Sequence, residues 1–144
     1  MCTKSCSHDL VVDKIGFRQI TTVEELISFW PFLQRIAKTN DSEALLRQFL
    51  ICLQSGLLLA IYTSGQLTSF CTVSRCGDYI LIHSLPSDGG KLGRTVLEYV
   101  KQWAIDAGVV EVQIVSERLC GSSFRYFEQT LGFQRKAMIF SLKV

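Results

Sequence analysis

One stretch of the chain carries no charged side chain over 27 consecutive residues, from position 48 to position 74. That length suffices for a membrane-spanning helix, which needs about 20 apolar residues. Two turn-like sequences interrupt the stretch, however: Gln-Ser-Gly at 54–56 and Ser-Gly-Gln at 64–66. Because the pieces between and after these turns have the length of strands, we predict the end of a helix followed by a β-hairpin, with strands over residues 57–63 and 66–74.

The composition fits one folded domain that binds neither nucleic acid nor membrane. The chain has 144 residues, of which 48% are hydrophobic and 19% charged, and its formal net charge is +2. Six basic and six acidic residues lie in positions 1–72, and nine basic and seven acidic residues lie in positions 73–144. No basic block stands out, so the composition argues against a nucleic-acid binder that relies on bulk electrostatics.

The six cysteines do not require a disulfide framework, because a chain of this length buries a sufficient core without one. No secretory signal is visible, so we expect a cytoplasmic protein with reduced, mostly buried cysteines. Cys2, Cys6 and His8 would need a fourth ligand to hold zinc, and we predict no metal site. We expect residues 1–13 to form a flexible segment ahead of a domain over residues 14–144.

Residue periodicity predicts a mixed α/β domain. Thr21 and Thr22 precede Glu24 and Glu25 at capping-box spacing, which predicts a helix start, and Pro31 predicts a kink or restart inside that helix. The predicted elements are a strand over 14–20, helices over about 21–38 and from 40 onward, the hairpin, a strand over 79–85, a helix over 94–107, a strand over 109–115, a helix over 122–131 and a closing strand over 137–144.

The most informative segment joins a strand to a helix over residues 79–99. Its loop holds Gly89, Gly90 and Gly93, which let backbone N–H groups approach a ligand closely. A helix N-terminus offers free donors and partial positive charge, and Lys91 and Arg94 add cations, so the segment favours an anion. Neither the P-loop nor the dinucleotide fingerprint fits, and a plain strand-to-helix connection also fits these residues.

Two motifs resemble the GNAT superfamily of N-acetyltransferases. The run from Asp88 to Gly93 is similar to the family's Gln/Arg-x-x-Gly-x-Gly/Ala loop, and SSFRYFEQTLGF at 122–133 is similar to its late helix, which ends Phe-Tyr-x-x-x-Gly-Phe. The resemblance implies a single-domain α/β fold with a central mixed, largely antiparallel sheet flanked by helices. It also implies acetyl transfer from acetyl-CoA to an amine acceptor, which the sequence does not identify. The sequence leaves open whether the protein forms a homodimer.

The resemblance implies a set of cofactor-binding residues, and the sequence departs from the family pattern at three points. Asp88 replaces the usual Gln or Arg, and Lys91 stands where the first motif glycine belongs. Four residues separate the aromatic pair Tyr126-Phe127 from Gly132 instead of three, so the family's tyrosine aligns with Glu128 by spacing and with Phe127 by the aromatic pair. The cofactor-binding residues implied are Leu85, Gly89, Gly90, Lys91, Leu92, Gly93, Arg94, Thr95 and Phe127.

Acyl transfer to an amine needs a base for the amine and an acid for the leaving thiolate. His83, on the strand that enters the loop, is the candidate base, and Tyr126 is the candidate acid. Each also fits a structural role, His83 as a histidine satisfied within the sheet and Tyr126 as a packed aromatic. A cysteine–histidine hydrolase would need one of the cysteines beside a histidine, and only Cys120 lies near a turn that opens a helix. The alternative function is a catalytically inactive GNAT-fold module that acts through bound CoA or a protein partner.

Overall fold

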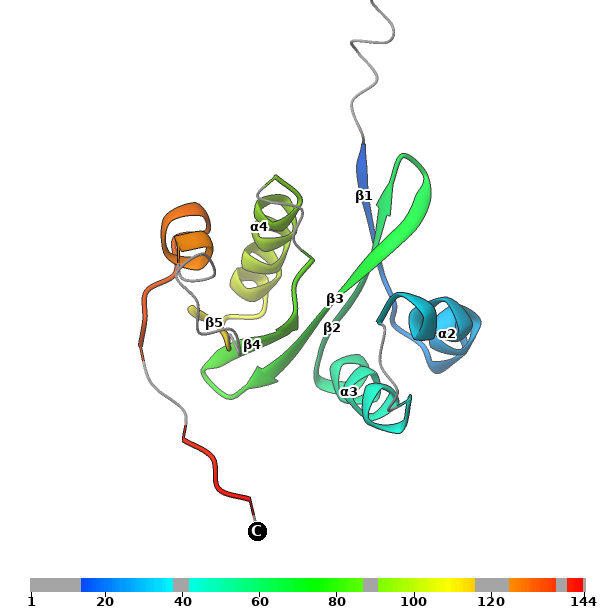
Figure 1. Ribbon diagram of the computed structural model, residues 1–144, viewed down its shortest axis with the longest axis horizontal. Coiled ribbons are helices and arrows are strands. Elements are labelled where there is room, and N and C mark those ends of the chain that lie inside the picture. Colours follow the sequence, from blue (N-terminus) through cyan, green and yellow to red (C-terminus); the bar gives the residue numbers. More distant parts are fainter. Residues whose placement is uncertain (1–13, 38–41, 87–90, 116–124, 137–139, 144) are drawn as a thin grey trace, which may run out of the picture.

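The computed structural model describes residues 14–37, 42–86, 91–115, 125–136 and 140–143. Helices α2 and α3 cover one face of the sheet, and α4 and the short helix η1 lie on the other side (Figure 1). The elements are β1 (Ile15–Gln19), α2 (Val23–Ala37), α3 (Ser42–Ser55), β2 (Gly56–Thr63), β3 (Gln66–Cys76), β4 (Tyr79–Ser84), α4 (Lys91–Asp106), β5 (Glu111–Ile114) and η1 (Tyr126–Thr130).

In the described part of the chain, five strands form one sheet in the order β1-β2-β3-β4-β5. The first three pairings are antiparallel, whereas β4 and β5 run parallel, and α4 is the crossover that a parallel pair requires. The structure therefore confirms the predicted mixed, largely antiparallel sheet flanked by helices.

The uncharged run folds as predicted, into a helix end and a hairpin. Helix α3 ends at Ser55, and β2 and β3 pair up to Thr63 and Gln66, with Ser64 and Gly65 between them. Both turn residues have positive φ angles, 51° and 81°, as the two-residue turns that match strand twist require. Within the described ranges, no helix is long and apolar enough to cross a membrane.

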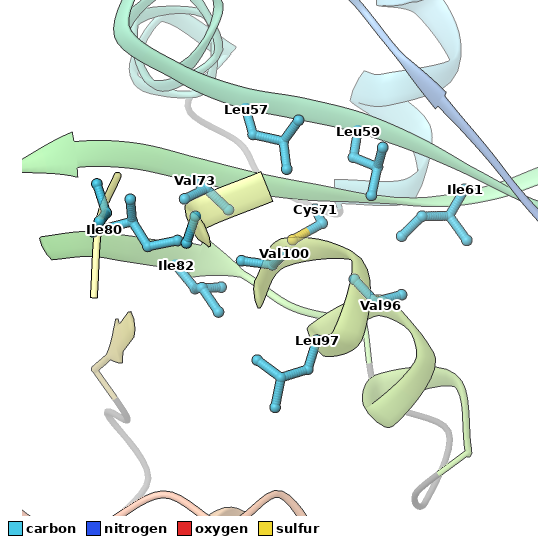
Figure 2. Close-up of a cluster of buried hydrophobic side chains, with 12 residues drawn as sticks. Leu57, Leu59, Ile61, Cys71, Val73, Ile80, Ile82, Val96, Leu97 and Val100 are labelled. Atoms are coloured by element: carbon cyan, nitrogen blue, oxygen red, sulfur yellow. The ribbon is translucent and has the colours of Figure 1, made fainter. Parts of the chain in front are cut away.

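Helix α4 packs its apolar stripe on the sheet (Figure 2). Val96 and Val100 are fully buried against side chains that alternate along β2, β3 and β4. The strand residues of this cluster are Leu57, Leu59, Ile61, Cys71, Val73, Ile80 and Ile82. The intervening residues of β2 and β3, such as Leu58 and Phe70, belong to a second cluster with α2 and α3, so the sheet has one core on each face.

Helix α2 begins as predicted but does not restart at Pro31. Of the two capping-box registers, the structure uses the later: the backbone N–H of Glu25 donates to Thr22 Oγ1 at 3.2 Å. The helix then runs unbroken through Pro31 to Ala37, so the predicted restart is wrong. Leu26 and Leu33, on either side of the proline, are buried in the same cluster, and this packing holds the two halves together despite the missing backbone donor.

The predicted closing strand is also wrong where the chain is described. Residues 140–143 are extended but have no strand partner, and Phe140 and Leu142 are 89% and 88% exposed. The residues alternate as a strand would, yet alternation cannot supply the neighbouring strand that hydrogen bonding needs. Of the helix predicted over 122–131, the structure describes Arg125 and η1, which is a π-helical turn.

Gly56→Ala is expected to lower the free energy of unfolding by about 2–3 kcal/mol, because the new methyl group would overlap the backbone carbonyl of Val73 on the paired strand. Gly16→Ala is the matched control, since its methyl group would lie 3.7 Å from Tyr62 Cβ, an ordinary contact. Urea denaturation of both variants measures the difference. Equal midpoints for the two variants would contradict the packing described for β2 and β3.

Candidate active site

The first turn of α4 carries positive charge and backbone N–H groups that have no partner within the helix itself. Lys91 and Arg94 are exposed there, and neither forms an ion pair with a carboxylate in the described part of the chain. The turn contains no acidic residue, whereas α2 and α3 both begin with glutamates. Thr95 Oγ1 donates to the carbonyl of Lys91 at 2.9 Å, which stabilises the turn from inside the helix. The arrangement favours an anionic ligand.

The side chain of Tyr126 packs against one side of the first turn of α4. Its hydroxyl lies so close to Gly93 that a Cβ atom on that glycine would overlap it, and the same Cβ would lie 3.4 Å from the carbonyl oxygen of Pro86. The hydroxyl is buried and has no hydrogen-bond partner among the described residues, like two other buried hydroxyls, those of Ser69 and Thr72. Gly93 is therefore required by the packing of Tyr126, whatever ligand the turn also binds.

The π-helical turn explains how Tyr126 reaches this place. The backbone N–H of Leu131 donates to the carbonyl of Tyr126 at 3.0 Å, an i to i+5 bond that widens the helix by one residue. The widening absorbs the extra residue between the aromatic pair and Gly132. Glu128 and Phe127, which align with the family's tyrosine, make other contacts. Glu128 pairs with Arg135 at 2.9 Å, and Phe127 packs edge-on against Phe133.

His83 lies on the other face of the sheet, at an irregularity of β4. The register shifts between Thr72 and Val73 of β3, which pair with Ser84 and Ile82, so His83 is the additional residue. Its Nε2 lies 2.7 Å from Ser74 Oγ. Because Ser74 alternates with Val73, whose side chain belongs to the α4 cluster, Ser74 and His83 lie on the face that α2 and α3 cover.

The sequence analysis missed Ser74, which is the partner of His83. Ser74 is only 7% exposed, and its Oγ also lies 3.8 Å from Cys76 Sγ. The available signal was the alternation of β3, which puts the polar Thr72 and Ser74 at inward positions of an otherwise apolar strand. Desolvation lowers the pKa of His83 below its ordinary value of 6.5, so the imidazole is neutral at neutral pH and is able to accept a proton.

The parallel pairing of β4 with β5 ends at Ile82 and Ile114, and His83 follows on β4 beyond the last pair. No hydrogen bond joins His83 to Tyr126 among the described residues: His83 contacts Ser74 of β3, whereas the hydroxyl of Tyr126 lies beside Gly93 of α4. Leu85 and Leu92 are half-buried against the α4 cluster on either side of the loop.

Several predicted residues lie outside the described part of the chain: Asp88, Gly89, Gly90 and Cys120, and the group Cys2, Cys6 and His8. Within the described residues, no three His, Cys, Asp or Glu side chains are grouped to hold a metal ion. Cys52, Cys71 and Cys76 are free thiols. Burial raises the pKa of Cys52 to about 11 and raises that of Cys71 further, so neither of these two is a nucleophile at neutral pH.

Comparison with known proteins agrees with this geometry. No family model matches the chain. It is 24% identical over 137 residues to the uncharacterized N-acetyltransferase YhdJ of Bacillus subtilis, covering 88% of this chain and 96% of that protein.

Two solved structures share the fold. One is the aminoglycoside N-acetyltransferase AAC(6')-Iy in complex with a bisubstrate analogue, CoA-S-monomethyl-acetylneamine, with a TM-score of 0.68, 17% identity, and coverage of 91% of this chain and 99% of that one. The other is a ribosomal-protein-alanine N-acetyltransferase from Brucella melitensis, with a TM-score of 0.66, 10% identity, and coverage of 90% and 99%. The sequence similarity to YhdJ and the fold shared with these acetyltransferases agree with the resemblance to the GNAT superfamily that the two motifs indicate.

Proposed function

We propose that this protein transfers an acetyl group from acetyl-CoA to an amine. The observation that carries the proposal is the buried, unpartnered hydroxyl of Tyr126 at the cationic first turn of α4. An unsatisfied buried polar group costs about 1–3 kcal/mol, so such a hydroxyl beside the cationic first turn of α4 supports a chemical role. The CoA-linked analogue bound to AAC(6')-Iy, a protein of the same fold, supports the same ligand class here.

Acetyl-CoA would bind along the loop between β4 and α4. The pyrophosphate would accept hydrogen bonds from backbone N–H groups of Gly89, Gly90 and the first turn of α4, and Lys91 and Arg94 would add charge from the exposed side. Leu85, Leu92 and Phe127 would border the less polar part of the cofactor. The thioester would then lie past the last β4–β5 pair, within reach of both faces of the sheet.

The reaction needs one proton removed and one proton supplied. The neutral amine attacks the thioester carbonyl carbon, forming the C–N bond, and the tetrahedral intermediate collapses with cleavage of the C–S bond. We assign His83 to take the proton that the amine nitrogen loses, and Tyr126 to donate its phenolic proton to the CoA thiolate. The proton held by His83 passes to solvent, and Tyr126 regains one from solvent, which completes the cycle.

The hydrogen bond to Ser74 fits the role of His83. If Nε2–H donates to Ser74 Oγ, the lone pair of Nδ1 is free to accept a proton, and the ring keeps its orientation after protonation. Ser74 is then a positioning residue. It touches His83 and not the reacting atoms.

The second candidate is a GNAT-fold module that binds CoA or a protein partner without transferring acetyl groups. Lys91, where the family loop has a glycine, favours it, because a side chain there occupies space beside the pyrophosphate. Release of free thiol from acetyl-CoA in a screen of amines separates the two candidates.

We place the protein in the cytoplasm, where the free thiols of Cys52, Cys71 and Cys76 persist, and we propose no nucleic-acid or membrane partner.

Acetyl-CoA is expected to bind the wild-type protein in a calorimetric titration, and Lys91→Ala is expected to weaken binding only about fivefold, because an exposed charge contact contributes about 1 kcal/mol. Lys101→Ala, another exposed lysine of α4 and the partner of Glu98, is the matched control and should bind like wild type. Absence of heat and of a thermal shift at millimolar acetyl-CoA would remove the cofactor from the proposal and leave a likeness of fold only.

Tyr126→Phe is expected to lower kcat about 100-fold, the scale of one general acid, without lowering the melting temperature. The hydroxyl that the variant lacks has no hydrogen-bond partner among the described residues. Its removal therefore breaks no hydrogen bond there and removes a desolvation cost of about 1 kcal/mol. Tyr62→Phe, on the α2 side of the sheet, controls for loss of a tyrosine hydroxyl elsewhere. Unchanged turnover in Tyr126→Phe would show that the hydroxyl is only packed.

The pH dependence of kcat/KM is expected to show an acidic limb with a pKa below 6.5. Desolvation lowers the pKa of His83, the base is active only when neutral, and the rate therefore falls as pH drops through that value. His83→Gln should remove this limb together with most of the activity. Ser74→Ala should retain the acidic limb of the pH profile and lower kcat less than His83→Gln does. A wild-type profile that is flat between pH 5 and 7, the span in which a histidine titrates, would exclude His83 as the base.

A further inference from the structure

A row of polar side chains lies on the face of β3 that is turned away from α4. Cys71 and Val73 point toward α4 (Figure 2), so the residues that alternate with them lie on the opposite face. Those residues are Thr72, Ser74 and Cys76. Thr72 is fully buried, Ser74 is 7% exposed and Cys76 is half-buried, so water has little access to the middle of the row.

Ser74 is the centre of a hydrogen-bonded chain of three side chains. Its Oγ lies 2.7 Å from His83 Nε2 and 3.8 Å from Cys76 Sγ. Thr72, its other neighbour in the row, does not take part, because Thr72 Oγ1 has no hydrogen-bond partner in the described part of the chain. Ser74 therefore joins the imidazole of His83 to the thiol of Cys76.

The single proton of the Ser74 hydroxyl determines which nitrogen of His83 is protonated. A serine hydroxyl donates one hydrogen bond and accepts up to two, and a neutral imidazole carries its proton on one nitrogen only. If Ser74 donates to Nε2 of His83, the ring proton lies on Nδ1, and the thiol of Cys76, a weak donor, has to donate to Ser74. If Ser74 donates to Cys76 Sγ, its oxygen accepts from Nε2–H, and Nδ1 keeps a free lone pair.

We propose that Cys76 is a positioning residue that sets the tautomer of His83 by accepting the proton of the Ser74 hydroxyl. The hydrogen bonds then lead from His83 Nε2–H to Ser74 Oγ and from Ser74 O–H to Cys76 Sγ. Nδ1 is left unprotonated, as the base of the proposed acetyl transfer must be. The effect on rate rests on that proposed function, whereas the tautomer is a property of the free protein and is measured without substrate.

Backbone pairing holds both ends of this chain in place. Cys76 is the last residue of β3 and pairs with Tyr79, the first residue of β4. His83 is the additional residue at the register shift near the other end of β4, and its imidazole leans back along the strand to reach Ser74. Because the same two strands fix all three side chains, a change at Cys76 acts on the ring through the hydroxyl between them.

NMR spectroscopy of the ring nitrogens, on the full isotope-labelled chain, tests the tautomer directly. At about pH 8 the ring is neutral, and the chemical shifts of its two nitrogens show which one carries the proton. The sequence holds one other histidine, and His8→Gln identifies the signals of His83. The wild type should carry the proton on Nε2. Cys76→Val, which removes the acceptor, should move most of the proton population to Nδ1, because Ser74 O–H then donates to Nε2.

Two further variants show whether the effect passes through Ser74. Thr72→Val makes the matching change on the other side of Ser74 and removes a hydroxyl that has no described partner, so the proton should stay on Nε2. Cys76→Val combined with Ser74→Ala removes the donor too, so the ring should return to Nε2–H, the form that a free imidazole prefers. Cys76→Ala introduces no bulk and should give the same tautomer as Cys76→Val, and unchanged amide spectra would show that the variants are folded.

The rate of acetyl transfer gives an independent readout. Cys76→Val should lower kcat about tenfold, part of the roughly 100-fold that one general base contributes, and leave the KM for acetyl-CoA unchanged. Adding Ser74→Ala to Cys76→Val should then raise kcat, whereas a purely structural role of Cys76 would make the two losses add.

The two readouts separate this proposal from the proposed function. A wild-type proton on Nδ1, a proton that stays on Nε2 in both Cys76 variants, or one that moves in Thr72→Val would overturn the role of Cys76, even if the protein acetylates amines. If no amine is acetylated, the proposed function fails, and the ring-nitrogen spectra still decide whether Cys76 sets the tautomer.

Discussion

The packing of α4 on the sheet is the contact on which the rest of this molecule depends. Val96 and Val100 lie fully buried against alternating side chains of β2, β3 and β4, and this fixes both the height and the rotation of the helix. The first turn of α4 is thereby held beside the ends of β4 and β5, with Gly93 facing inward. Rigid support of this kind gives backbone donors the fixed positions that recognition of an anion requires.

The same sheet divides the proposed chemistry between its two faces. Strand alternation directs Val73 toward α4 and Ser74 toward the opposite face, so the base candidate His83 is positioned by Ser74, whereas the acid candidate Tyr126 packs against Gly93 of α4. In the proposed mechanism the proton acceptor and the proton donor thus belong to different elements, the bulged end of β4 and the turn η1, so neither competes for the other's proton.

The elements could be predicted from sequence wherever a local cause determines them. The Ser64–Gly65 turn, the end of α4 before Gly108 and the strands of the uncharged run follow from turn chemistry and periodicity. Features set by distant residues could not. Pro31 stays helical because of Leu26 and Leu33, and the partner of His83 depends on a register shift between β3 and β4. Residues 140–143 alternate as a strand would, but pairing is a property of two segments.

The π turn of η1 affects how this helix compares with one that lacks it. One residue inserted into an ordinary α-helix turns every side chain beyond it by about 100° around the axis. A single widened turn takes up the additional residue locally, and η1 is such a turn, with Tyr126 and Phe127 inside it and Gly132 after it. A comparison by position along the chain therefore sets Phe127 or Glu128 against the tyrosine of a helix without the widened turn, although Tyr126 is the residue that faces Gly93.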